Sequence, residues 1–110
     1  MRQRYILAMT LTVLLLSGCG QQKDDTFLKS SITTPADEKA AALYKNQCIS
    51  CHAADLSGRV GPDLQKVGAS LSKKQLISIL EEGANGMPAY KKRLEKEEIE
   101  ALAEWLAALK

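Results

Sequence analysis

Apolar residues recur at helical spacing in three segments of the chain, which span residues 34–47, 72–83 and 95–110. No segment alternates with the period of two that marks a β-strand. The predicted buried faces are, in chain order, Ala40, Leu43, Tyr44 and Gln47; Leu76, Ile79 and Leu80; and Ile99, Leu102, Trp105, Leu106 and Leu109. The pattern predicts one small all-α domain over residues 35–110.

The starts of these helices carry capping signals of unequal strength. Thr34 and Asp37 are three residues apart at the start of the first helix, and Ser72 and Gln75 have the same spacing at the second. The third helix has Glu95 at this position, where a Ser, Thr or Asp would cap better. We therefore expect the first turn of the last helix to fray.

The other end of the chain has the pattern of an export signal. Arg2 and Arg4 precede an apolar run over residues 5–16, which is shorter than the ~18 residues that a membrane span needs. The following "LSGC" resembles the lipobox of bacterial lipoproteins. That resemblance implies that residues 1–18 are cleaved and that Cys19 becomes a lipidated N-terminus. An ordinary signal peptide, or a short uncleaved anchor with an incidental Cys19, is the alternative.

Residues 19–34 are polar and predict a flexible tether. Phe27, Leu28 and Ile32 are their scattered apolar residues. About 15 flexible residues have an end-to-end distance of roughly 20 Å and a stretched limit near 50 Å. The alternative is an arm that packs on the domain through Phe27.

Charge and size exclude some functions and raise a question about the core. The chain has 15 basic and 13 acidic residues, and loss of Arg2 and Arg4 with the signal leaves 13 of each. A balanced chain without a long basic run gives no footprint for nucleic acid. Domains below about 80 residues usually need a staple, and this one has one Trp, two Tyr and no Phe after Pro35. Something other than side chains should fill its centre.

The run "CISCH" indicates what fills it. Cys48, Cys51 and His52 match the Cys-x-x-Cys-His signature of c-type haem attachment, in which two thiolates add to the haem vinyl groups and the imidazole ligates iron. A thioredoxin-like redox pair would need alternating strands and helices, which are missing. A zinc site would need a fourth ligand. Copper or zinc binding by these three residues in a non-haem lipoprotein is the remaining alternative.

Elimination indicates a second axial ligand. After removal of the signal, Met87 is the only methionine, and His52 is the only histidine. Met87 lies in the Gly/Pro-containing loop "GANGMPAY" between two helices. A buried gap-filling methionine is the alternative.

Taken together, these features resemble the class I c-type cytochromes, and specifically the small lipid-anchored cytochromes c-551 of Gram-positive bacilli. The resemblance runs from the lipobox to the last helix and includes "GPDL" at residues 61–64 and "MPAY" at residues 87–90. It implies that the Pro62 carbonyl accepts a hydrogen bond from His52 and that Leu64 packs on the haem. It also implies a crossing of the first and last helices at Ala40, Tyr44, Leu102 and Trp105. Ala40 replaces a frequent glycine of the family, which should separate the two helices slightly.

The resemblance and the ligand set imply an electron carrier and not an enzyme. One covalently attached haem c with low-spin iron, closed by His52 and Met87, has no vacant position for oxygen or peroxide. The family implies a monomer on the outer face of a bacterial membrane, between a bc-type quinol:cytochrome c reductase and cytochrome c oxidase in the respiratory chain. A haem enzyme or ligand sensor would require Met87 to be off the iron or readily displaced.

Overall fold

The structure is a computed structural model that describes residues 25–110. The predicted signal, Cys19 and the first part of the predicted tether lie outside the described residues. The described helices are α2 (Thr26–Ser30), α3 (Pro35–Gln47), α4 (Ile49–His52), α5 (Val67–Ser70), α6 (Lys73–Glu82) and α7 (Lys96–Ala108). Within residues 25–110 there is no β-strand, only an isolated bridge between Ala84 and Met87. The all-α prediction is confirmed, and the short α2, α4 and α5 are additions to it.

The predicted caps form at α3 and α6, and α7 is capped in another way. At α3 the Asp37 N–H donates to the Thr34 hydroxyl, while the Thr34 N–H donates to the Asp37 carboxylate. Ser72 makes the same reciprocal pair with Gln75 at α6. At α7 the Glu95 N–H donates to the Glu98 carboxylate at 2.9 Å. A bond to the start of the helix therefore opposes the fraying that the sequence predicted.

The core is built on the packing of α3 against α7. The rings of Tyr44 and Trp105 meet edge to face at 5.6 Å between centroids, and Ala40 and Leu102 are buried with them. An edge-to-face pair contributes about 0.5–1.5 kcal/mol beyond the area that it buries. The predicted crossing of the first and last helices is therefore present. Three predicted core positions differ, because Gln47 is exposed and Leu43 and Ile79 are half-buried.

The N-terminal arm, defined as residues 25–32, is packed on the domain. Leu28 in α2 is 0 % exposed and belongs to the main apolar core, with Phe27 and Ile32 packed against it. The Trp105 indole N–H donates to the Ser31 carbonyl at 3.1 Å. These contacts differ from a flexible tether over residues 19–34 and match the alternative of a packed arm, with Leu28 as its most buried residue.

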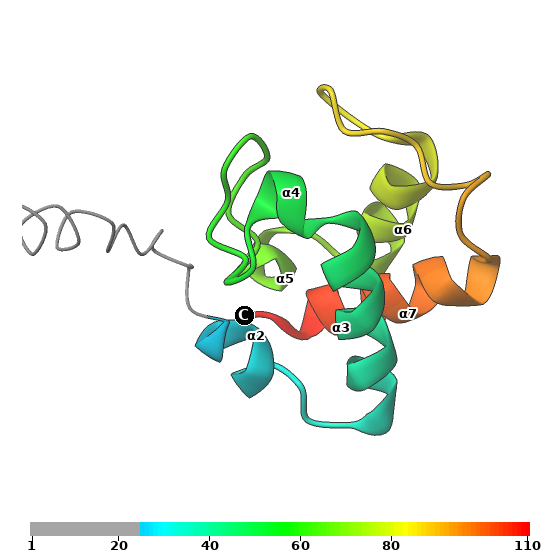
Figure 1. The fold of residues 1–110 in the computed structure, drawn as a ribbon. Helices are drawn as coiled ribbons and strands as arrows, with labels where there is room; N and C mark the ends of the chain where they lie inside the picture. The colour runs from blue at the N-terminus through cyan, green and yellow to red at the C-terminus, as the bar shows by residue number, and fades with distance from the viewer. Residues whose placement is uncertain (1–24) are drawn as a thin grey trace, which may run out of the picture.

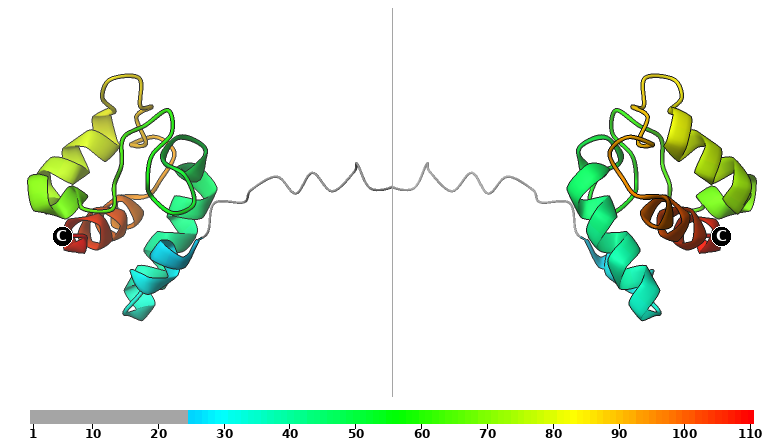
Figure 2. Two further views of the ribbon diagram at one scale, coloured as in Figure 1. Left: turned by 90° about the vertical axis from the view of Figure 1, so that its left-hand side faces the viewer. Right: turned by 90° about the vertical axis from the view of Figure 1, so that its right-hand side faces the viewer.

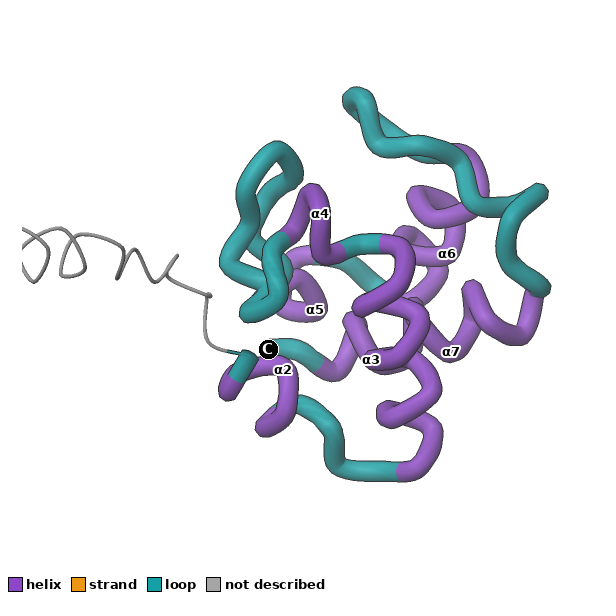
Figure 3. Tube along the Cα trace, in the orientation of Figure 1, coloured by secondary structure: helices purple, strands orange, loops and turns teal. Residues whose placement is uncertain are grey.

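Two long loops rise on one side of the domain. One connects α4 to α5 and the other connects α6 to α7 (Figure 1, Figure 3). Figure 2 shows both loops on the side away from α2 and α7, which form the opposite side. Since α6 packs against α7, the second loop starts from a fixed base. The two loops and the helices below them surround the candidate site.

Candidate functional site

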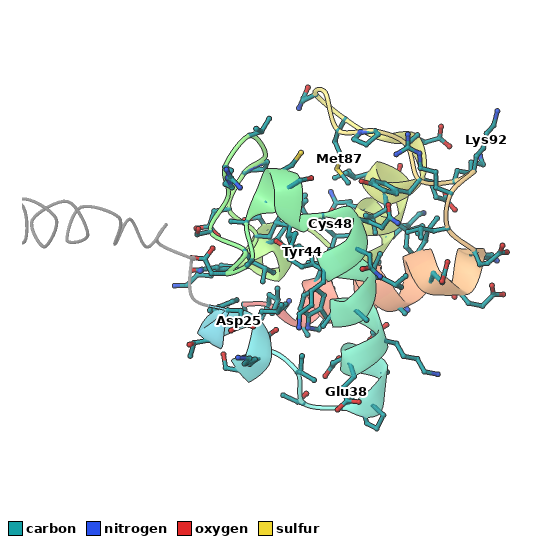
Figure 4. The ribbon with its side chains drawn as sticks, viewed as in Figure 1. Asp25, Glu38, Tyr44, Cys48, Met87 and Lys92 are labelled. Carbon is teal, nitrogen blue, oxygen red and sulfur yellow. The ribbon has the colours of Figure 1, made fainter. Side chains whose placement is uncertain are left out.

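A cavity of about 910 Å³ lies between the two loops. This volume is at the upper end of the about 300–1,000 Å³ that ligand pockets have. We call the lining that carries Cys48, Cys51 and His52 the thiol wall, and the lining formed by the α6–α7 loop, with Met87, the Met87 wall (Figure 4). Figure 4 labels Cys48 and Met87, which come from different segments that border this cavity. Apolar side chains from α6 and α7, including Leu76, Leu80, Leu102 and Leu106, complete the lining.

The histidine is held in one orientation by the loop that follows it. His52 is the last residue of α4 and is buried. Its Nδ1 lies 2.9 Å from the Pro62 carbonyl oxygen. Because a carbonyl can only accept, Nδ1 carries the proton and donates it, and Nε2 keeps a free lone pair. The imidazole is therefore in the tautomer that can ligate a metal through Nε2.

Gly61 makes room for this imidazole. A Cβ atom at position 61 would lie 2.6 Å from His52 Cε1 and 3.0 Å from Nε2, which is shorter than van der Waals contact. Glycine is therefore required by close approach, since its φ angle is not positive. The "GPDL" segment thus supplies both a cleft for the ring and an acceptor for its proton. Leu64, at the end of the segment, lines the cavity and donates its N–H to the Leu56 carbonyl at 2.8 Å.

The wall that carries the thiols is tied by backbone hydrogen bonds. The Cys51 carbonyl accepts from Gly61 at 2.8 Å and from Arg59 at 3.1 Å, and the His52 carbonyl accepts from Gly58 at 2.9 Å. On the far side, the Tyr44 hydroxyl donates to the Ala53 carbonyl at 2.6 Å. The Cys-x-x-Cys-His segment therefore has little freedom to move.

The two thiols are half-buried, and neither forms a disulfide. Burial, together with the nearby Cys51, raises the pKa of Cys48 to about 11. A redox-active Cys-x-x-Cys pair needs a lowered thiol pKa, because the thiolate is the nucleophile. The environment of Cys48 is therefore unlike that of a thioredoxin-type dithiol.

Met87 is presented by a tight turn. The Met87 N–H donates to the Ala84 carbonyl at 2.9 Å across Asn85 and Gly86, whose φ angles are +48° and +89°. Two positive φ angles define a type I′ turn, for which Asn-Gly is the favoured pair. At the base of the turn, a Cβ on Gly83 would collide with the Met87 carbonyl oxygen. The sequence "GANGM" thus fixes the backbone of the residue that faces the thiol wall.

These groups fit a haem and fit a bare metal ion poorly. Within residues 25–110, no three His, Cys, Asp or Glu side chains converge to hold a metal ion, so Cys48, Cys51 and His52 do not form such a set. The cavity instead offers two thiols and an imidazole along one wall, a thioether on the other and apolar side chains between them. That donor set suits a large planar group attached at one side and ligated from both faces.

A small all-α domain built around such a cavity is typical of a c-type cytochrome, and comparison with known protein families agrees. Residues 35–106 match the family described as cytochrome c oxidase, cbb3-type, subunit III. The chain belongs to the class I c-type cytochromes.

Among its relatives is cytochrome c-551 of Bacillus subtilis (strain 168), 35% identical over 101 residues, with 87% of this chain and 86% of that protein covered. Cytochrome c-550 of the same organism is 32% identical over 82 residues, which cover 74% of this chain and 67% of the relative. The protein is therefore an electron-transfer protein with covalently bound haem c and not an enzyme.

The structure brings together the sequence-predicted site residues that it describes, while Cys19 lies outside the described residues. Cys48, Cys51, His52, Pro62, Leu64 and Met87 all line the one cavity. The hydroxyls of Tyr44 and Tyr90 donate to backbone carbonyls beside the thiol wall, and no local pattern in the sequence predicts these bonds. An aromatic residue directly after Met-Pro-Ala was the available signal for Tyr90.

Proposed function

We propose that this cytochrome is a membrane-anchored carrier of single electrons whose iron is ligated by His52 and Met87. Cys48 and Cys51 would form the two thioether bonds. The observation that carries the proposal is the bond from His52 Nδ1 to the Pro62 carbonyl, which leaves Nε2 free beside a cavity that Met87 borders from the opposite wall. Haem closed on both faces supplies one-electron chemistry without an open site for oxygen or peroxide.

Each of the proposed site residues has a physical role in this function. The Pro62 carbonyl holds the imidazole tautomer and strengthens it as a donor to iron. The soft thioether of Met87 favours ferrous iron and so raises the reduction potential. Leu64 and the apolar lining exclude water from the cofactor. Two covalent bonds at the thiol wall would keep the haem from escaping outside the cell.

The ligand assignment is tested on the purified protein with its haem. A pyridine haemochrome spectrum is expected to show haem attached through two thioethers, which persists after denaturation. The ferric protein is expected to show the weak red sulfur-to-iron band, and the ferrous protein to resist carbon monoxide. A spectrum without the red band, together with rapid carbon monoxide binding, would remove Met87 from the iron.

The location is also part of the proposal. The lipobox-like "LSGC" supports lipidation of Cys19 and attachment to the outer face of the membrane. Among the helices of residues 25–110, none has the length and apolar character that a membrane crossing needs. The family supports a monomer in a respiratory chain, and the partners that we propose are a bc-type quinol-oxidising complex and a terminal oxidase.

Two measurements test the anchor and its purpose. Mass spectrometry of the mature protein should find a diacylglyceryl group on Cys19, and a free thiol there would contradict the anchor. Cys19→Ala, exported with an ordinary signal peptide, should keep the haem spectrum but leave the membrane. Its oxidation by membranes that contain the oxidase should then be slower at equal total protein, because a tethered carrier has a higher effective concentration. Equal rates would contradict the benefit of tethering.

A further inference from the structure

Tyr90 joins the two walls of the cavity. It follows Met87 by three residues, and its hydroxyl donates to the Gln47 carbonyl at 3.0 Å. Gln47 is the last residue of α3 and directly precedes Cys48. The bond therefore connects the loop that carries the thioether to the start of the thiol wall, 43 positions earlier in the chain.

Tyr90 is held both at its backbone and at its hydroxyl. The residue is only 6 % exposed, and its N–H donates to the Leu80 carbonyl of α6 at 2.9 Å. The Arg93 guanidinium lies over the ring, 5.8 Å from its centroid. Burial raises the pKa of the Tyr90 hydroxyl, so it remains a protonated donor at neutral pH. The rigid ring therefore keeps a constant distance between Gln47 and the loop.

The rest of the loop has few ties to the domain. Its residues Ala84, Asn85, Gly86, Pro88 and Ala89 are exposed. The one backbone bond within residues 84–89 runs from Met87 to Ala84 and lies inside the turn itself. After the turn, the neighbouring Lys91 adds only a long backbone bond of 3.4 Å to Glu81 and an exposed ion pair with Glu82. The Tyr90 hydroxyl is therefore the tie that crosses the cavity.

We propose that Tyr90 is a positioning residue that sets the separation between the Met87 loop and the thiol wall, and so holds the Met87 sulfur on the iron. This inference rests on the proposed ligand role of Met87. A buried hydrogen bond of this kind stabilises the position of the Met87 loop near the thiol wall. Its loss should therefore make it easier for an external ligand to displace the thioether.

The test is Tyr90→Phe in the protein with its haem, which removes the hydroxyl and keeps the ring. Ferric protein is titrated with imidazole, which must displace the thioether to bind. Loss of one buried hydrogen bond is expected to tighten imidazole binding about fivefold and to weaken the red band on mild warming. The reduction potential should also fall, because more of the population has lost the thioether.

The matched control is Tyr44→Phe. Tyr44 is a fully buried tyrosine whose hydroxyl donates to the Ala53 carbonyl, so its bond does not reach the loop that carries Met87. Both variants should lose thermal stability, but Tyr44→Phe should tighten imidazole binding less than Tyr90→Phe does, because the bond that it loses does not involve the Met87 loop. Equal imidazole affinity in Tyr90→Phe and wild type, or the same increase in both variants, would overturn the positioning role. A wild-type protein without the red band would instead overturn the ligand assignment beneath it.

Discussion

The two walls of the cavity are built in different ways. The wall that carries Cys51 and His52 is held by several backbone bonds and by a side-chain bond to Pro62. The wall that carries Met87 is one exposed turn, tied across the cavity through Tyr90. A histidine fixed in this way is poised before any cofactor binds. The thioether of Met87 lies on a turn with fewer bonds to the rest of the domain.

The walls also differ in how they tolerate unusual backbone angles. On the Met87 wall, positive φ angles fall on Asn85 and on glycines, which adopt them at low cost. On the histidine wall they fall on Gly58 but also on two residues with side chains, Ala53, with φ +69° and ψ +159°, and Leu56, with φ +60°. Such angles cost about 1–3 kcal/mol in a residue with a side chain. Surrounding bonds, including that from Tyr44, hold the histidine wall in this strained form.

The largest expected effects come from removing His52 or Met87, and the two variants should differ in whether they keep haem. His52→Ala should abolish the accumulation of stable haem-containing protein, since it removes both the proposed ligand and the bond to the Pro62 carbonyl. Met87→Ala should keep covalent haem but lose the red band and bind carbon monoxide in the ferrous state. Haemochrome quantification and carbon monoxide titration measure the two outcomes. Equal loss of haem in both variants would show that the walls are equivalent.

Gly61→Ala should be the next most damaging change. The added Cβ would meet the His52 ring at 2.6 Å, and overpacking of this kind costs about 1–3 kcal/mol. Gly86→Ala is the control on the other wall, because a Cβ there meets nothing within 4 Å and only its φ of +89° is unfavourable, at about 1 kcal/mol. Urea unfolding of the ferric protein compares them. A larger loss for Gly86→Ala would contradict the tight fit around His52.

Ala53→Gly should stabilise the protein. Glycine adopts the φ and ψ of Ala53 without a Cβ penalty, so a gain of about 1 kcal/mol is expected from relief of strain. Ala54→Gly is the matched control, since its φ is not positive, and it should cost about 0.5 kcal/mol by loosening the unfolded chain. Denaturant midpoints measure both. A loss of stability in Ala53→Gly would contradict the claim that this wall stores strain.

The smallest effect should come from the ion pair beside the Met87 loop. Lys91 lies 3.1 Å from Glu82, but both side chains are 64% exposed. Exposed pairs are screened by solvent and salt and contribute little. Lys91→Ala should therefore leave the unfolding midpoint and the imidazole affinity unchanged within error. If it instead matched Tyr90→Phe, the loop would be held by charge and not by the hydroxyl.

Local signals in the sequence predicted much of this molecule. The α3 and α6 caps each lie within four residues, so Thr34 and Ser72 could be identified directly. The Cys-x-x-Cys-His motif is equally local. Met87 could be predicted as the second ligand because it is the only methionine that remains after the predicted signal is removed. The bond between Tyr90 and Gln47 joins distant parts of the chain, and no local pattern encodes it.

The packed arm has only a weak signal in the sequence. Leu28 and Ile32 are four residues apart, which is helical spacing, yet two apolar residues in a polar stretch are insufficient to predict burial. Leu28 is buried in the core cluster that also contains Tyr44 and Trp105, and this cluster forms only when α3 and α7 have packed together. The start of α7 is capped through Glu98, which lies three residues after Glu95 and accepts from its N–H, so the residue type at position 95 alone does not decide whether this turn frays.

The packed arm also changes what the proposed anchor can do. Cys19 and Asp25 are six residues apart along the chain, and six residues span at most about 20 Å when fully extended. The packed residues cannot add to this reach, so the domain would pivot close to the lipid headgroups. Its search for partners would then be lateral diffusion in the plane of the bilayer, and only redox centres that stand near that surface would be accessible to it.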